Sequence, residues 1–264
     1  MTAGFPARYG PWAVVLGAGQ GIGRAFAREL AVRGLDLLLI DLREDLLEEA
    51  AGEARAQGRD VRCAMLDLAD VGVGKQLAAA AAPLDLGLVV YTAMISRVGL
   101  FLDDDLATHL RVLGVGCAGP LATARVLGAS LCRRGRGGMI LTSSLAGFQG
   151  TGFVAGYSAC KAYDLALAEA LWWEWKPLGV DVLALAPGST DTPGFQAHQP
   201  RVDRASLQSA AAVAREALDA LGKQHLLVPG EGNRQVRAAL DKLPRQQLVE
   251  VMGEQTRAQF RTES

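Results

Sequence analysis

The sequence lacks any pair of cysteines at the spacing of a metal site or a redox motif. Its four cysteines, Cys63, Cys117, Cys132 and Cys160, lie far apart along 264 residues, and no C-x-x-C pair occurs. This absence argues against a zinc site and against a thioredoxin-type motif. We expect four free thiols in a reducing compartment.

The sequence also lacks an excess of charge and an obvious targeting segment. With 27 basic and 28 acidic residues, the formal net charge is −1, so no basic field would attract nucleic acid. Met1–Pro11 has no basic stretch followed by an apolar run, and apolar runs such as Leu35–Ile40 are too short to cross a bilayer. We expect a cytoplasmic protein with no nucleic-acid partner and no membrane contact.

Short apolar runs alternate with helix-length amphipathic segments along the whole chain. The runs are nearly continuous in apolar residues, as in strands buried on both faces of a parallel sheet. This pattern predicts an α/β fold, a single domain over residues 1–264 with a Rossmann-type doubly wound parallel sheet of about seven strands and helices on both faces. The predicted strands are Trp12–Leu16, Leu35–Ile40, Val61–Leu66, Leu86–Tyr91, Met139–Thr142, Val180–Leu185 and His225–Val228. The predicted helices are Ile22–Arg33, Glu44–Gln57, Val73–Ala82, Leu106–Arg133, Gly156–Lys176 and Leu207–Leu221.

Two segments interrupt this alternation. Residues 189–206 are polar and rich in Pro, Gly, Gln and Thr, which indicates a long loop that could serve as a substrate lid. His198 lies within it and could contact substrate. Residues 232–260 predict a tail of two helices, split near Pro244.

A glycine-rich turn follows the first predicted strand and leads into a helix. Glycines let the backbone approach a pyrophosphate closely, and the N–H groups of a helix N-terminus favour its negative charge. The sequence therefore predicts a dinucleotide cradle. Its residues are Gly17, Gly19, Gln20, Gly21, Ile22 and Gly23.

An acidic residue, Asp41, ends the second predicted strand, with Leu42 beside it. A carboxylate at this place can accept hydrogen bonds from the adenosine ribose hydroxyls and repels a 2′-phosphate. Asp41 therefore predicts NAD in preference to NADP. Arg43 is the opposing signal, because its guanidinium could reach a 2′-phosphate.

Tyr157 and Lys161 lie one turn apart on a predicted helix, so they share a face. An ammonium near a phenol stabilises the phenolate and lowers the tyrosine pKa, which lets the phenol exchange a proton with an alcohol or ketone oxygen. Ser144 follows a strand end upstream, and its hydroxyl could hold the same oxygen. We predict that these three residues are catalytic, and we expect no metal.

These motifs together resemble the short-chain dehydrogenase/reductase family over nearly the whole chain. The matching segments are Gly17–Gly23, Ser143–Gly147, Tyr157–Lys161 and Pro187–Thr192, and Asp67 matches the family's acid on the adenine side. The resemblance implies a small-molecule alcohol or ketone substrate and a homodimer or homotetramer. It also implies that the cofactor contacts Asp67, Leu68, Thr92, Ala93, Tyr157, Lys161, Pro187, Gly188, Thr190 and Thr192.

The chain departs from the family pattern at two places that matter for the site. The family's N-N-A-G segment reads Tyr91-Thr92-Ala93-Met94 here, and its helix asparagine, which helps to hold a water in the proton relay, falls on Gly116. The first departure and the tail resemble a bacterial hydroxysteroid dehydrogenase-like subgroup. We therefore expect an NAD-dependent oxidoreductase acting on a secondary alcohol or ketone of a lipophilic, steroid-like or other cyclic substrate. The alternative is a catalytically weak or idle nucleotide-binding sensor.

Overall fold

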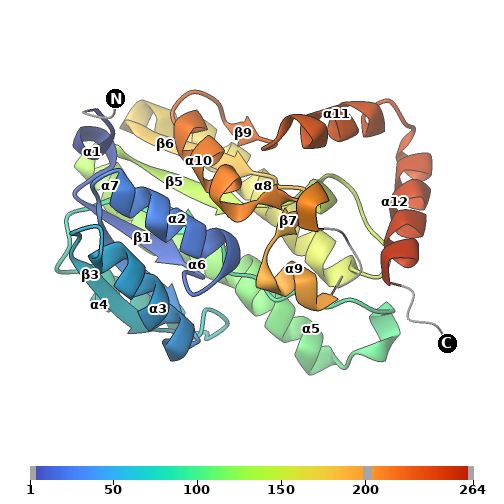
Figure 1. The fold of residues 1–264 in the computed structure, drawn as a ribbon, viewed down its shortest axis with the longest axis horizontal. Coiled ribbons are helices and arrows are strands. Elements are labelled where there is room, and N and C mark those ends of the chain that lie inside the picture. The colour runs from blue at the N-terminus through green and yellow to red at the C-terminus, as the bar shows by residue number, and fades with distance from the viewer. Residues whose placement is uncertain (1–3, 199–203, 261–264) are drawn as a thin grey trace.

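The fold is built on one parallel sheet of seven strands, seen in a computed structural model that describes residues 4–198 and 204–260. The strand order is β3-β2-β1-β4-β5-β6-β9, so the chain order reverses between β1 and β4. Figure 1 shows the fold, with β1, β3, β5, β6 and β9 labelled. The strands are β1 (Trp12–Leu16), β2 (Asp36–Asp41), β3 (Val61–Met65), β4 (Leu86–Tyr91), β5 (Gly137–Thr142), β6 (Val180–Leu185) and β9 (Leu226–Leu227). The predicted doubly wound sheet of seven strands is confirmed.

Burial explains why the strands could be read from the sequence. All six residues of β4 and all six of β5 are buried, and β2 is exposed only toward its two ends. A strand covered on both faces has no polar face, so it reads as a continuous apolar run.

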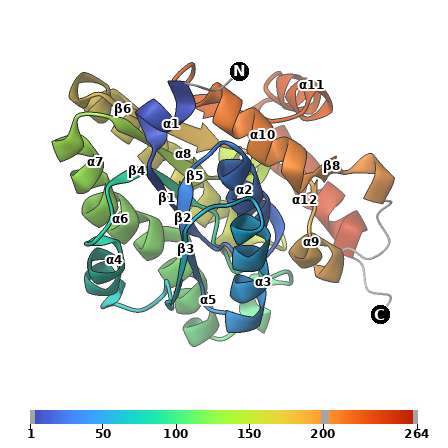
Figure 2. The same cartoon turned by 60° about the vertical axis from the view of Figure 1, so that its left-hand side comes forward.

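Helices cover both faces of the sheet (Figure 2). Phe26 and Leu30 of α2 and Val213 of α10 belong to one apolar core, together with α3. Leu77 of α4 and Ala168 of α8 belong to the other. The helices are α2 (Gly21–Val32), α3 (Glu44–Arg55), α4 (Val73–Ala81), α5 (Leu106–Leu113), α6 (Gly119–Thr123), α7 (Ala129–Arg134), α8 (Ala155–Trp175), α9 (Pro193–His198), α10 (Ala210–Ala220), α11 (Glu231–Leu240) and α12 (Arg245–Phe260).

One helical stretch runs from α5 through α7 and contains two π-helical segments. These segments span Gly114–Ala118 and Ala124–Gly128. By length and hydropathy this stretch could cross a membrane, and the sequence analysis overlooked it among the apolar runs. Half of its most apolar window is buried inside the fold, however, as expected for a core helix.

The sequence analysis also missed several short elements. Helix α1 (Gly4–Tyr9) precedes the sheet, and the ion pair of Arg8 with Asp181 ties it to β6. Two-residue strands β7 (Thr190–Asp191) and β8 (Gln208–Ser209) pair in parallel, which brings the two ends of the predicted lid together. Strands this short carry no periodicity from which they could be predicted. Residues 199–203 and the side chain of His198 lie outside the described residues.

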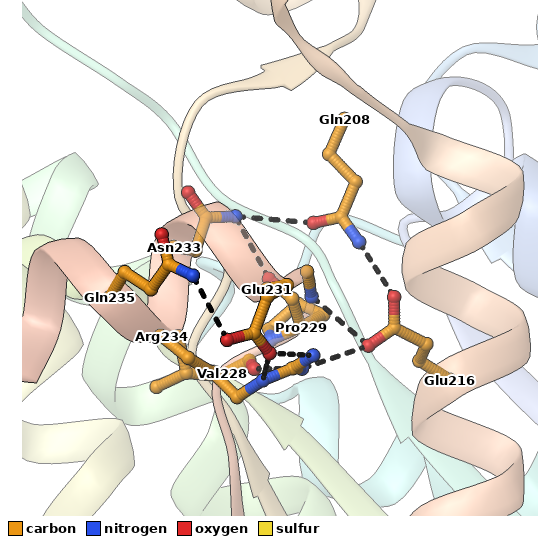
Figure 3. Close-up of polar contacts among 9 residues, drawn as sticks. Gln208, Glu216, Val228, Pro229, Glu231, Asn233, Arg234 and Gln235 are labelled. Atoms are coloured by element: carbon orange, nitrogen blue, oxygen red, sulfur yellow. Dashed lines mark hydrogen bonds and ion pairs between the residues drawn. The ribbon is translucent and has the colours of Figure 1, made fainter.

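The tail forms two helices, α11 and α12, as predicted, and they lie along one edge of the molecule (Figure 1). A polar cluster at the start of α11 joins them to the body (Figure 3). Asn233 donates hydrogen bonds to the Gln208 side chain at 3.2 Å and to the Pro229 carbonyl at 2.8 Å. Gln208 donates to Glu216 of α10, which also accepts from the Gly230 N–H.

Candidate active site

The glycine turn between β1 and α2 lies against the end of β4. Gly17 and Gly21 have positive φ angles of 84° and 56°, a conformation that glycine adopts without steric cost. A Cβ on Gly17 would lie 2.6 Å from the Ala93 nitrogen, and a Cβ on Gly23 would overlap the Gly17 carbonyl. Thr92 holds the turn by donating to the Leu16 carbonyl at 2.8 Å. The turn therefore requires glycine, and it keeps backbone N–H groups accessible at the start of α2.

A cavity of about 310 Å³ opens at this turn, at the carboxyl ends of the strands. Ligands of doubly wound sheets bind at this edge, where the strand order reverses. The glycine cradle, a helix N-terminus and the carboxylate that ends β2 fit the chemistry of a dinucleotide. Of the predicted cofactor residues, the cavity is lined by Gly17, Gln20, Gly21, Ile22, Gly23, Asp41, Leu42, Asp67, Leu68, Thr92, Ala93 and Thr192.

Six predicted cofactor residues do not line this cavity. Pro187 and Gly188 lie beside Ser144, Thr190 is buried and donates to the Gly188 carbonyl, and Gly19 donates its N–H to Asp41. Tyr157 and Lys161 lie on α8, outside the cavity lining. The lining residues that the sequence analysis missed are Leu66, Met94, Ile95, Arg111, Val115 and Gly194.

The carboxylates of the cavity are held by nearby donors. Asp41 accepts hydrogen bonds from the N–H groups of Gly19, Leu42 and Arg43. Asp67 accepts from the Ala69 N–H and pairs with Arg111 at 3.0 Å, and these contacts lower the pKa of the Asp67 carboxyl despite its partial burial. Arg111 could have been suspected from its place in α5, but no spacing rule links it to Asp67.

Tyr157 and Lys161 share one face of α8, as the spacing predicts. The Lys161 nitrogen lies 5.8 Å from the centre of the Tyr157 ring. Ser144 follows β5; its hydroxyl accepts from the Ala146 N–H at 3.2 Å and lies 3.5 Å from the Pro187 carbonyl oxygen. Among the described residues, none forms a hydrogen bond with the Tyr157 hydroxyl.

The buried ammonium of Lys161 has two partners that the sequence analysis did not identify. It donates to the Thr142 carbonyl at 2.7 Å and to the Asp164 carboxylate at 3.0 Å. Burial alone would lower the pKa of Lys161, but Asp164 and the Tyr157 phenol act in the opposite direction and leave that pKa above its ordinary value. An acid three residues after the lysine, within an otherwise apolar stretch of helix, was the signal for this pair.

A second, smaller hollow borders Tyr157. Its lining is mixed: Leu100, Phe101, Val112 and Phe153 contribute apolar side chains, and Arg97, Asp104 and His109 contribute polar ones. Phe153 has a φ of 63°, which is uncommon for a residue other than glycine and often marks a functional site. His109 stacks on Phe101 at this hollow.

In the part of the chain that the structure describes, no group of three His, Cys, Asp or Glu side chains could hold a metal ion. The four cysteines are free, and Cys160 is fully buried.

Comparison with known families adds to this geometry. Residues 11–203 match the short chain dehydrogenase family. The chain belongs to this family. It is therefore a short-chain dehydrogenase, an oxidoreductase of CH–OH groups with an NAD(P) cofactor.

Several relatives of this short-chain dehydrogenase are hydroxysteroid dehydrogenases. A 7beta-hydroxysteroid dehydrogenase of Clostridium sardiniense is 31% identical over 252 residues, covering 94% of this chain and 97% of the relative. One of Collinsella aerofaciens is 28% identical over 233 residues, covering 86% and 89%. A solved structure from a study of 7beta-hydroxysteroid dehydrogenase stereoselectivity has a TM-score of 0.88 and 26% identity, covering 94% of this chain and 98% of that one.

Proposed function

We propose that this short-chain dehydrogenase interconverts a secondary alcohol and a ketone through proton exchange at the Tyr157 hydroxyl. The observation that carries the proposal is the pairing of Tyr157 with the buried Lys161 cation on one face of α8. Ser144, at the end of β5, supplies a hydroxyl that orients the substrate oxygen. The nicotinamide ring supplies or accepts the hydride when the cofactor is bound.

In the oxidative direction, the Tyr157 phenolate removes the hydroxyl proton of the substrate, and in the reductive direction the phenol returns it to the carbonyl oxygen. The Lys161 ammonium favours the phenolate and would also hold the nicotinamide ribose. Pro187, Gly188, Thr190 and Thr192 would hold the carboxamide side, chiefly through the backbone.

We propose NAD as the preferred cofactor. Asp41 lines the cavity at the end of β2, where its charge would repel a 2′-phosphate. The rival residue, Arg43, makes a two-pronged contact with Asp45 on the protein surface, at 3.1 and 2.7 Å. That contact competes with any role for Arg43 in binding a 2′-phosphate. A structure from Beutenbergia cavernae described as an NAD(P)-dependent gluconate 5-dehydrogenase, 29% identical with a TM-score of 0.76 over 83% of this chain and 95% of that one, contains NADP.

The substrate we propose is a steroid-like, lipophilic secondary alcohol. The aliphatic and aromatic side chains in the hollow beside Tyr157 support it, and so do the names of the relatives. Residues 189–206 would act as a lid over the substrate. Helix α12 would form a wall, because Arg245 donates to the Phe148 carbonyl and Arg257 lies over the Phe153 ring.

We further propose a cytoplasmic homodimer or homotetramer. Leu106, Leu110 and Leu113 expose an apolar stripe on α5, and Trp173 is exposed on α8. Burying these side chains between copies would remove apolar surface from water. Sedimentation of the purified protein measures the assembly, and a monomer at micromolar concentration would contradict it.

The experiment for the activity uses purified protein, NAD and a panel of secondary alcohols that includes epimeric pairs of steroid alcohols. NADH formation is followed by absorbance. We expect turnover that Tyr157→Phe abolishes and that Tyr163→Phe, a matched change on the same helix, retains. NAD binding with no turnover on any alcohol would instead support a nucleotide sensor, which the relatives do not favour.

A further inference from the structure

The lysine of the proposed acid–base pair has its own buried counter-ion. The side chains of Lys161 and Asp164 are 4% and 1% exposed, and their charged atoms are 3.0 Å apart. An isolated charge so deep in the protein would be very costly, so each ion depends on the other. Because the Thr142 carbonyl and Asp164 each accept one hydrogen bond, the ammonium retains one N–H that neither of them uses.

The surroundings of Asp164 contain no competing cation. Within residues 4–198 and 204–260, Lys161 is the only cation that pairs with Asp164. The other titratable groups near the carboxylate are Tyr91, Cys117, Cys160 and Tyr163, and burial followed by charges that include Asp164 raises the pKa of each of them. They are therefore neutral near pH 7. Burial raises the pKa of the Asp164 carboxyl above its ordinary value, and the Lys161 ammonium opposes that rise.

The neighbouring helix offers Lys161 no side chain at the position of the family's asparagine. Gly116 stands there, and the space beside its Cα is filled by Cys160 and by Met94. The neighbouring Val115 carbonyl accepts a hydrogen bond from the Tyr91 hydroxyl, with 2.6 Å between the two oxygens. The side chain that contacts the Lys161 ammonium therefore comes from Asp164, in the same helix α8, and not from residue 116.

We propose that Asp164 is a positioning residue that keeps the Lys161 ammonium charged and aimed, and that raises the proton affinity of the Lys161–Tyr157 pair. This inference rests on the acid–base role proposed above for Tyr157 and Lys161. A negative charge close to two coupled groups makes loss of a proton from either of them less favourable. Removing the charge should therefore shift the first deprotonation of the pair to lower pH.

The test is a tyrosinate titration of the protein without cofactor, followed by absorbance between pH 6 and the onset of unfolding. Subtracting the curve of the matching Tyr157→Phe protein isolates the Tyr157 signal from those of the other three tyrosines. We expect the midpoint to fall by roughly one pH unit in Asp164→Asn, as for loss of a nearby charge. Glu174→Gln, which removes an exposed charge from the same helix, should leave the midpoint unchanged, and Asp164→Glu should return it toward the original value.

A folded Asp164→Asn protein with an unchanged midpoint, or with a midpoint at higher pH, would overturn the inference. If Asp164→Asn does not fold, Asp164→Ser provides a smaller neutral side chain for the same titration. The two proposals fail in different ways. If Tyr157→Phe retains dehydrogenase activity, the acid–base role itself is wrong. If Tyr157 is essential for activity but the midpoint of its titration is the same in the Asp164 variants, only the role of Asp164 is wrong.

Discussion

The side chain of Cys160 fills the space that any side chain at Gly116 would need. A Cβ built on Gly116 would lie 2.6 Å from the Cys160 sulfur and 2.7 Å from its Cβ. Gly116 also lies in the first π-helical segment, a type of irregularity that is frequent at functional sites. The two residues therefore form one packing unit, in which glycine at residue 116 leaves room for the Cys160 side chain.

We predict that Gly116→Ala destabilises the protein. The overlap with Cys160 costs about 1–3 kcal/mol of overpacking, which outweighs the gain of at most about 1 kcal/mol in helix propensity. The net loss in the free energy of unfolding should be about 1–2 kcal/mol, measured by urea denaturation. Gly52→Ala is the matched control, because a Cβ there meets nothing within 4 Å in helix α3 and should stabilise the protein. Equal stability changes at the two sites would contradict the packing argument.

Replacing Asp41 should change the cofactor preference. Asp41→Ala removes the charge that repels a 2′-phosphate, so the ratio of kcat/KM for NADP to that for NAD should rise at least about tenfold, or about 1.4 kcal/mol. Asp41→Ser serves as a second variant, since its hydroxyl can still accept the Gly19 N–H. An unchanged ratio in both variants would mean that Asp41 does not discriminate between the cofactors.

The thiols should react slowly with alkylating agents at neutral pH. Burial raises the pKa of Cys160 to about 12 and that of Cys63 to about 11, the latter with help from Glu48. Since only the thiolate reacts, at pH 8 Cys63 should be modified on the order of 100-fold more slowly than free cysteine. Its rate should rise about tenfold per pH unit up to pH 10 in the folded protein, as measured by mass spectrometry with iodoacetamide. Rapid labelling of either residue at pH 7 would show that its site opens.

The only asparagine of the chain should be important for the attachment of the tail. Asn233→Asp keeps the shape but loses both donors and places an anion beside the Pro229 carbonyl and the Gln208 side-chain oxygen, so we expect a loss of roughly 1–3 kcal/mol. Hydrogen exchange should accelerate in α11 before it does in the sheet. Gln235→Glu is the control: it is the same chemical change, in an exposed contact with Glu231, and should cost less than about 0.5 kcal/mol. Similar losses in both variants would contradict a special role for the cluster.

The sequence predicted the sheet and the cradle well because both depend on local patterns. A strand such as β4 is buried on both faces, and the turn at Gly17 needs glycine for its backbone angles. The contacts of Asp164, Arg111 and Cys160 depend on which side chains meet after folding. The sequence analysis identified none of these contacts, although the spacing of Lys161 and Asp164 along one helix could have indicated the first, and nothing local indicated the π-helical segments.

The pairing of β7 with β8 suggests how new specificities could be engineered. The two short strands pair Thr190 with Gln208 and Asp191 with Ser209. The segment between the strands therefore begins and ends at the same fixed place in the fold. A replacement peptide grafted between residues 195 and 207 would inherit both attachment points without altering the parallel sheet, and it would leave Thr192 and Gly194 of the cavity in place. That stretch can therefore be exchanged as a cassette, with the catalytic scaffold held constant.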